Sequence, residues 1–141
     1  IAQPLSEMAK RAGYKVRVID PRTHFASEER FSDIVLTHDW PEDALAAKPL
    51  GARSAIVALT HDPKFDDLAL AAALRSPAFY IGALGSKKSH AKRLERLKQA
   101  GFTNKELERI HGPVGLSIGA RSPSEIAISI LAEMTRDLRT A

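Results

Sequence analysis

Apolar residues follow two alternating patterns along the chain. Short apolar runs with several β-branched side chains are typical of strands, and longer segments with apolar positions every three to four residues are typical of helices. The runs predict strands at residues 14–20, 33–37, 54–60, 78–84 and 114–119. The segments between them predict helices at residues 2–13, 38–47, 65–76, 86–100, 103–110 and 122–138.

This alternation predicts the fold class. The runs at residues 54–60 and 78–84 are apolar at nearly every position, which indicates strands buried on both faces. Buried strands separated by helices predict a doubly wound, mostly parallel sheet with helices on both faces, a Rossmann-like α/β fold in three layers. No segment has the composition of a linker, so we expect residues 1–141 to form a single domain. Because the first predicted element is a helix, we expect the first strand of such a fold and its glycine turn to be missing.

Composition narrows the classes of function. The chain of 141 residues is 44% hydrophobic, which is enough for one core, and its net charge of +4 permits an anionic partner. Aromatic residues make up 6% of the chain, which is few for a surface that stacks nucleic-acid bases, so nucleic-acid binding is disfavoured. The absence of cysteine excludes disulfides and thiolate metal ligands. No apolar run is long enough to cross a membrane, and we expect a cytoplasmic protein.

The helix predicted at residues 86–100 begins with an unusual charge pattern. Its first turn carries Lys87 and Lys88, although the helix dipole favours acids there and the mismatch costs about 0.3–1 kcal/mol. Acidic residues stand near the other helix starts, at Glu42, Asp43, Asp66, Asp67, Glu106 and Glu125. A bound anion would reverse the mismatch, because the amide groups after Gly85, the Ser86 hydroxyl and both ammonium groups would converge on it.

A second interpretation of this helix is a basic face in contact with solvent. Lys88, Lys92 and Arg96 recur every fourth residue, on the side opposite Leu94 and Leu97. The pattern leaves both interpretations open. His90 shares the face of the two leucines, so we expect a half-buried structural histidine.

Polar residues at the end of two other predicted strands are candidates for ligand contacts. Asp20 stands where dinucleotide-binding folds place an acid that accepts hydrogen bonds from a ribose, although the fingerprint G-x-G-x-x-G is absent. The alternative is that Asp20 caps the turn that continues into Arg22. The most buried predicted strand is followed by Thr60, His61 and Asp62. This position favours contact with a ligand, with an acid–base role for His61. The alternative is that these residues only form the turn after the strand.

The remaining candidates are glycines and one cation. Gly82 lies inside the apolar run at residues 78–84, and Gly119 and Arg121 precede the last helix, whose start is predicted from Ser122. One interpretation is that Arg121 places a cation near a second helix start, where an anion could bind. The alternative is that Gly119 only forms the turn between strand and helix. We expect no metal site, because the histidines and acids after the strands match no ligand spacing: His38, Asp39, His61 and Asp62.

Three stretches resemble a known family. They are "VIDPR" at residues 18–22, "LTHDPKFDDLALAAALRSPAFYIGALGSKKSHAKRLERL" at 59–97 and "IHGPVGLSIGARSPSEIAISILAEM" at 110–134. They resemble the C-terminal Rossmann domain of the XdhC/CoxI family, whose members are accessory proteins of xanthine dehydrogenase and related molybdenum hydroxylases. Family members also carry a smaller N-terminal domain.

The resemblance implies a role in enzyme maturation. Such proteins bind the molybdenum cofactor, a molybdopterin that bears a phosphate, protect it during sulfuration and insert it into the apo-enzyme. It implies a carrier or chaperone rather than a catalyst, with a molybdenum hydroxylase apo-enzyme as partner, and it leaves open a cysteine desulfurase as second partner and a homodimer. The competing interpretation is an NAD(P)-binding oxidoreductase domain, from Asp20 and the alternation of strands and helices. The candidate cofactor-binding residues are Asp20, Arg22, Thr60, His61, Asp62, Gly82, Gly85, Ser86, Lys87, Lys88, Gly119 and Arg121.

Overall fold

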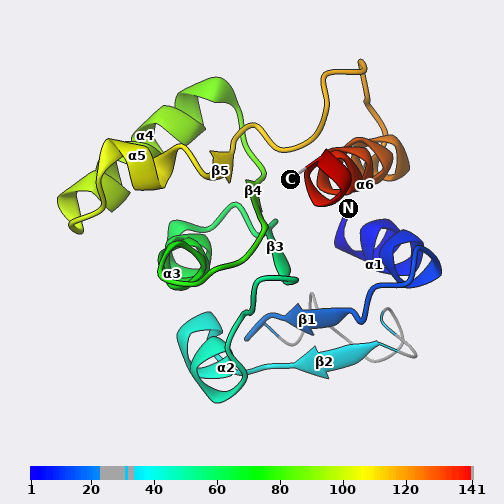
Figure 1. Cartoon of the computed structure of the whole chain (residues 1–141), viewed down its shortest axis with the longest axis horizontal. Helices are drawn as coiled ribbons and strands as arrows, with labels where there is room; N and C mark the ends of the chain where they lie inside the picture. Colours follow the sequence, from blue (N-terminus) through cyan, green and yellow to red (C-terminus); the bar gives the residue numbers. More distant parts are fainter. Residues whose placement is uncertain (23–30, 32–33, 141) are drawn as a thin grey trace.

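The structure is a computed structural model, and it describes residues 1–22, 31 and 34–140. Helices and strands alternate along the described chain, as the sequence predicts (Figure 1). The elements are α1 (Ala2–Arg11), β1 (Arg17–Ile19), β2 (Val35–Thr37), α2 (Pro41–Ala47), β3 (Ala55–Ala58), α3 (Pro63–Leu74), β4 (Tyr80–Ala83), α4 (Lys87–Gln99), α5 (Asn104–Leu107), β5 (Ile110–His111) and α6 (Pro123–Thr140).

Every pairing between the described strands is parallel, which confirms the predicted α/β class. The described strands form two sheets, because β1 pairs only with β2, and β4 lies between β3 and β5. In the larger sheet Ile56 stands opposite Ile81, and Ile81 stands opposite Ile110. No described strand joins β1 to β3 by a hydrogen-bonded ladder.

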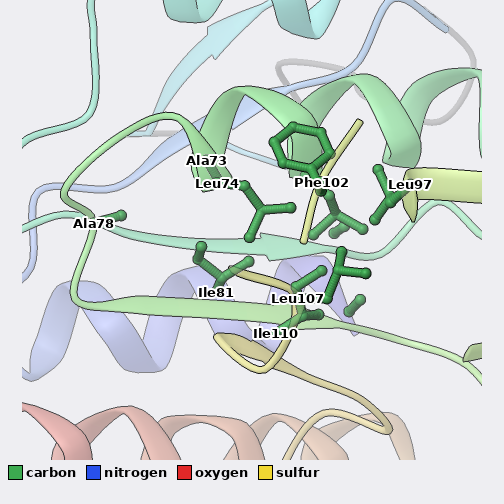
Figure 2. Packing of buried hydrophobic residues seen from close by; sticks show 11 residues of the cluster. Ala73, Leu74, Ala78, Ile81, Leu97, Phe102, Leu107 and Ile110 are labelled. Carbon is green, nitrogen blue, oxygen red and sulfur yellow. The ribbon is translucent and has the colours of Figure 1, made fainter. Parts of the chain in front are cut away.

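Helices cover both faces of the larger sheet. Figure 1 shows α1 and α6 side by side on one face, where Leu5 and Ile130 pack against Tyr80 of β4. On the other face, helices α3 and α4 and the segment around α5 enclose the cluster drawn in Figure 2, which includes Ile81 and Leu97. Successive strand residues face opposite sides of a sheet, and Tyr80 and Ile81 accordingly enter different clusters.

Local sequence explains where the helices begin. Ser122 caps α6, since its Oγ accepts a hydrogen bond from the Glu125 amide at 3.1 Å, as predicted. Helix α3 begins at Pro63, earlier than the predicted residue 65. Asp62 is its cap and accepts from the Lys64 amide at 3.1 Å, and a proline is well suited to the position that follows a cap.

The predicted strand at residues 114–119 is wrong. The strand is β5, at Ile110–His111, where the predicted short helix was expected to end. The Val114 amide donates to the Ala83 carbonyl at 3.2 Å and the Leu116 amide to the Ser129 carbonyl at 3.1 Å. This segment therefore passes from β4 to α6 instead of pairing along one strand.

A polar cluster is buried where this segment meets α6. The Tyr80 hydroxyl donates to Oε1 of Glu133 at 2.6 Å, and the Gly115 amide donates to the same atom at 3.1 Å. The His111 ring stacks on Tyr80 with centroids 4.7 Å apart, and its Nε2 lies 2.7 Å from Oδ2 of Asp137. Burial, and next the hydrogen bond to Glu133, raise the pKa of Tyr80.

The raised pKa of Tyr80 predicts a loss of stability in alkali. Above about pH 10 an unfolded tyrosine ionises while Tyr80 in the folded chain keeps its proton, so the free energy of unfolding falls by about 1.4 kcal/mol per pH unit from this group. Urea unfolding from pH 8 to 11 should show a shallower fall for Tyr80→Phe than for wild type, since all other groups titrate alike in both. Parallel profiles would contradict the prediction.

No helix among the residues that the structure describes is both long and apolar enough to cross a membrane.

Candidate functional site

Several predicted residues gather at the ends of parallel strands. Asp20 follows β1, the turn at residues 60–62 follows β3, and the turn at residues 84–86 follows β4. We call this part of the molecule the carboxyl edge. Ligands of open parallel α/β sheets bind at such an edge, so each of these turns is a candidate for ligand contact.

The turn from β4 into α4 has the features of an anion site. Gly85 adopts a φ of +150°, and a Cβ atom on it would lie 2.6 Å from Oγ of Ser89, so the position requires glycine. Lys87 and Lys88 are exposed and follow immediately. Their amide groups are the first of the helix and have no partner within it, which leaves two donors beside two ammonium groups.

Two expectations about this helix start need adjustment. The Ser86 hydroxyl already caps α4, since it accepts from the Ser89 amide at 3.1 Å, and it also contacts Oγ of Ser89 at 3.2 Å. Helix α1 also lacks an acid in its first turn, so the absence of an acid is not unique to α4. What distinguishes α4 is the presence of two cations there.

Arg93 is a functional candidate that the sequence analysis missed. Its side chain is 4% exposed, and its Nη2 donates to the Leu84 carbonyl at 2.9 Å and lies 3.6 Å from the Cβ position of Gly85. Burial lowers its pKa, yet a guanidinium stays charged. Within the described part of the chain no carboxylate lies within 4.0 Å of it, and its Nε has no hydrogen-bond partner. The signal was its spacing, because Arg93 stands four residues before Leu97 on the buried face of the helix.

The basic face of α4 is only partly in contact with solvent, because some of its side chains contact other elements. Arg96 forms two hydrogen bonds to Asp67 of α3, from Nε at 2.7 Å and Nη2 at 3.2 Å, and this contact raises its pKa. His90 is half-buried, as predicted, and burial lowers its pKa. Its ring lies against Gly112, where a Cβ atom would be 2.3 Å from it. Lys88 and Lys92 remain exposed.

The turn after β3 is held by a buried carboxylate. Asp66 accepts hydrogen bonds from the Thr60 amide at 3.2 Å, the Thr60 hydroxyl at 2.6 Å and the His61 amide at 3.0 Å. Asp62 serves as the cap of α3. His61 adopts a φ of +64°, which is uncommon for a residue with a side chain, and is exposed. Thr60 and Asp62 thus have the turn roles that were predicted as the alternative, and an acid–base role for His61 stays a prediction.

Asp20 has the geometry of a turn cap. Its buried carboxylate accepts from the Arg22 amide at 2.9 Å, from Arg22 Nε at 3.0 Å and from Nη2 at 2.9 Å. The hydrogen bond is the main cause of the raised pKa of Arg22. Arg22 donates three hydrogen bonds to this carboxylate, and the predicted ribose contact stays a prediction.

For the other predicted residues, Gly82, Gly119 and Arg121, no side-chain hydrogen bond to these turns is described. Gly82 lies inside β4, where a Cβ atom would be 2.5 Å from Cγ2 of Val114, so packing explains this glycine. The amides of Arg121 and Ser122 each donate to Oε1 of Glu125 at 2.9 Å. A carboxylate of the chain itself therefore occupies the start of α6. Gly119 is exposed and turns the chain there with a φ of +76°.

An aromatic pair at the carboxyl edge was also missed by the sequence analysis. Trp40 follows β2 and Phe65 lies in the first turn of α3, with ring centroids 4.9 Å apart and planes inclined by 44°. The Arg22 guanidinium lies 5.3 Å and the Lys64 ammonium 5.0 Å from the centroid of Phe65. Over the described residues, no group of three or more histidine or acidic side chains could hold a metal ion.

The parallel strands are covered by helices on both faces, and a turn at the carboxyl edge carries Gly85 followed by Lys87 and Lys88. This arrangement defines a Rossmann-type α/β domain. The chain belongs to the XdhC family, because the family model described as the XdhC Rossmann domain matches residues 1–134.

Similar proteins support this assignment. The chain is 36% identical over 91 residues to the molybdenum cofactor insertion chaperone PaoD of Escherichia coli, a match that covers 64% of the chain and 29% of PaoD. It is 32% identical over 133 residues to a probable xanthine dehydrogenase subunit of Bacillus subtilis, covering 93% of the chain and 38% of that protein. A crystal structure of a xanthine dehydrogenase from Bacillus halodurans matches with a TM-score of 0.83 and 32% identity, over 99% of the chain and 40% of that structure. The chain thus spans well under half of each relative.

Proposed function

We propose that the chain is the Rossmann domain of a maturation factor that binds the molybdenum cofactor and delivers it to a molybdenum hydroxylase apo-enzyme of the xanthine dehydrogenase type. The observation that supports it is the membership of the XdhC family, together with the similarity to a relative named as a molybdenum cofactor insertion chaperone. The finer parts of the proposal are protection of the cofactor during sulfuration and docking of a cysteine desulfurase. In this role the domain is a carrier rather than a catalyst.

The turn from β4 into α4 fits the phosphate of a molybdopterin. Arg93 provides a buried positive charge with no carboxylate within ion-pair distance among the described residues, and a bound anion would balance it. The amides of Lys87 and Lys88 would donate to the phosphate oxygens, and Gly85 lets the backbone approach closely. When bound, the cofactor supplies the redox centre that the recipient enzyme uses. The residues of this chain hold its phosphate end and keep it from diffusing away.

Reversing the two cations tests this site. In the variant Lys87→Glu/Lys88→Glu we expect molybdopterin to bind at least about tenfold more weakly, since two attractive charges become repulsive. The apo domain should be as stable as wild type or more stable by about 0.3–1 kcal/mol, because acids suit the helix start. Cofactor binding would be measured by equilibrium titration, and stability by urea unfolding.

The same helix offers a matched control. Lys92 and Lys98 are exposed on α4 beyond its first turn, and Lys92→Glu/Lys98→Glu makes the same change in net charge. We expect nearly unchanged molybdopterin affinity in this variant. Equal weakening in both variants would mean that only overall charge matters. A destabilised Lys87/Lys88 variant that binds normally would show the two lysines to be structural.

The NAD(P)-binding interpretation is not adopted. It depends on Asp20, whose carboxylate accepts all its described hydrogen bonds from Arg22. Titration with NADH and NADPH beside molybdopterin would distinguish the two: tight nicotinamide binding without pterin binding would overturn the proposed function.

A further inference from the structure

We infer that Trp40 is the stacking platform for the planar ring of the bound ligand, a fused heterocycle that carries a phosphate. The inference rests on the proposed function and assigns a place for the ring at the carboxyl end of β2.

The location of Trp40 sets it apart from the other large apolar side chains on the surface. Its side chain is 41% exposed, and Val35, Ile118 and Ile128 are the others described as exposed. Val35 begins β2 at the opposite edge, Ile118 lies in the segment before α6, and Ile128 lies on α6 itself. Trp40 stands three residues after the end of β2, whereas Ile118 stands seven residues after the end of β5, so Trp40 is the nearest of the four to the carboxyl end of a strand, where ligands of parallel α/β folds bind.

The Trp40 indole packs against another aromatic ring, and the backbone of Trp40 is restricted in conformation. Phe65 is buried, and its ring contacts Trp40 at a centroid distance of 4.9 Å. Pro41 follows Trp40 and restricts it to the extended backbone that it adopts, with φ −65° and ψ 148°. A rigid aromatic surface loses little conformational entropy when a ring stacks on it.

The charges around the pair select the kind of ring. The Arg22 guanidinium, which pairs with Asp20, and the Lys64 ammonium, whose Nζ lies 3.9 Å from Oδ2 of Asp62, lie within 5.3 Å of the centroid of Phe65. An apolar ligand gains nothing from two cations at the border of its site. A polar heterocycle with carbonyl and ring-nitrogen acceptors and a phosphate gains from both stacking and charge. A phosphorylated pterin and a nucleotide base with its phosphate share this chemistry.

The sequence allows a direct test, because Trp40 is the only tryptophan in the chain. We expect neopterin monophosphate to quench the tryptophan emission in a saturable way, and inorganic phosphate to leave it unchanged. By calorimetry, Trp40→Ala should bind neopterin monophosphate about 5- to 150-fold more weakly, the effect of losing one stacked ring. Trp40→Phe should stay within a few-fold of wild type, and Val35→Ala is the matched control with unchanged affinity.

The outcomes separate the two proposals. If wild type binds neopterin monophosphate while the emission stays constant and Trp40→Ala keeps wild-type affinity, the stacking inference is wrong and the proposed function stands. If wild type binds neither neopterin monophosphate nor molybdopterin, the proposed function and the inference both fail. A circular dichroism spectrum equal to that of wild type would show that Trp40→Ala is folded, and Trp40→Phe provides the comparison if it is not.

Discussion

Replacing Glu133 with alanine is expected to lower the free energy of unfolding by about 3–5 kcal/mol, because the Tyr80 hydroxyl and the Gly115 amide lose their shared acceptor. Glu133 is 7% exposed, and its Oε1 accepts from the Tyr80 hydroxyl at 2.6 Å and the Gly115 amide at 3.1 Å. Tyr80 is 1% exposed, so its hydroxyl has almost no access to bulk solvent in the folded chain. Each unsatisfied buried donor costs about 1–3 kcal/mol, and the removed side chain leaves a cavity.

Glu133→Gln is the matched control. A glutamine keeps the size of the side chain, and its carbonyl oxygen can still accept from Tyr80 and Gly115, so we expect a loss of only about 1 kcal/mol. His111 Nδ1 lies 3.5 Å from the same carboxylate oxygen and would lose a charged neighbour in both variants. Urea unfolding monitored by circular dichroism would measure both losses. Equal losses in the two variants would mean that the charge, rather than the shared acceptor, holds this cluster together.

The fold was predictable where its signals are local. The apolar runs at residues 54–60 and 78–84 became β3 and β4, because an apolar run needs burial on both faces wherever it lies. The start of α6 followed from Ser122 and Glu125, which satisfy each other's backbone amides without help from the rest of the molecule.

The incorrect prediction of a strand at residues 114–119 shows that a local sequence pattern does not always determine the structure. Val114, Leu116 and Ile118 alternate with small residues as a strand would. The amides of Val114 and Leu116 bond to β4 and α6 respectively, and no spacing within the segment encodes that division. Tertiary contacts decided the outcome.

The residues of the candidate site were also predictable only where a local sequence signal marks them. Lys87 and Lys88 could be noticed because helix dipoles make first-turn cations unusual. Arg93 lay hidden at an apolar-face position, and only the structure shows that no carboxylate described here lies within 4.0 Å of it. Trp40 and Phe65 are far apart in sequence and come together through two neighbouring helix starts, so no local pattern pairs them.

Replacing Gly82 with alanine is expected to lower the free energy of unfolding by about 2–3 kcal/mol, through overpacking of the core. A Cβ atom there would lie 2.5 Å from Cγ2 of Val114 and 2.9 Å from Cε2 of Tyr80, which is 1% exposed and hydrogen-bonded to Glu133. This residue was a candidate for cofactor binding, and the alternative explanation is the close approach of Val114 to β4.

A double-mutant cycle with Val114→Ala distinguishes these explanations. Removing Cγ2 of Val114 relieves the nearest clash, so the double variant should be more stable than the sum of the single losses by about 1 kcal/mol, while the Tyr80 contact keeps the rescue partial. Molybdopterin affinity, measured where each variant is folded, should change little. A Gly82→Ala variant that keeps wild-type stability but loses molybdopterin binding would assign Gly82 to the ligand instead. In that case the site would extend from the turn after β4 into the strand itself, and Val114 would lie beside the bound cofactor.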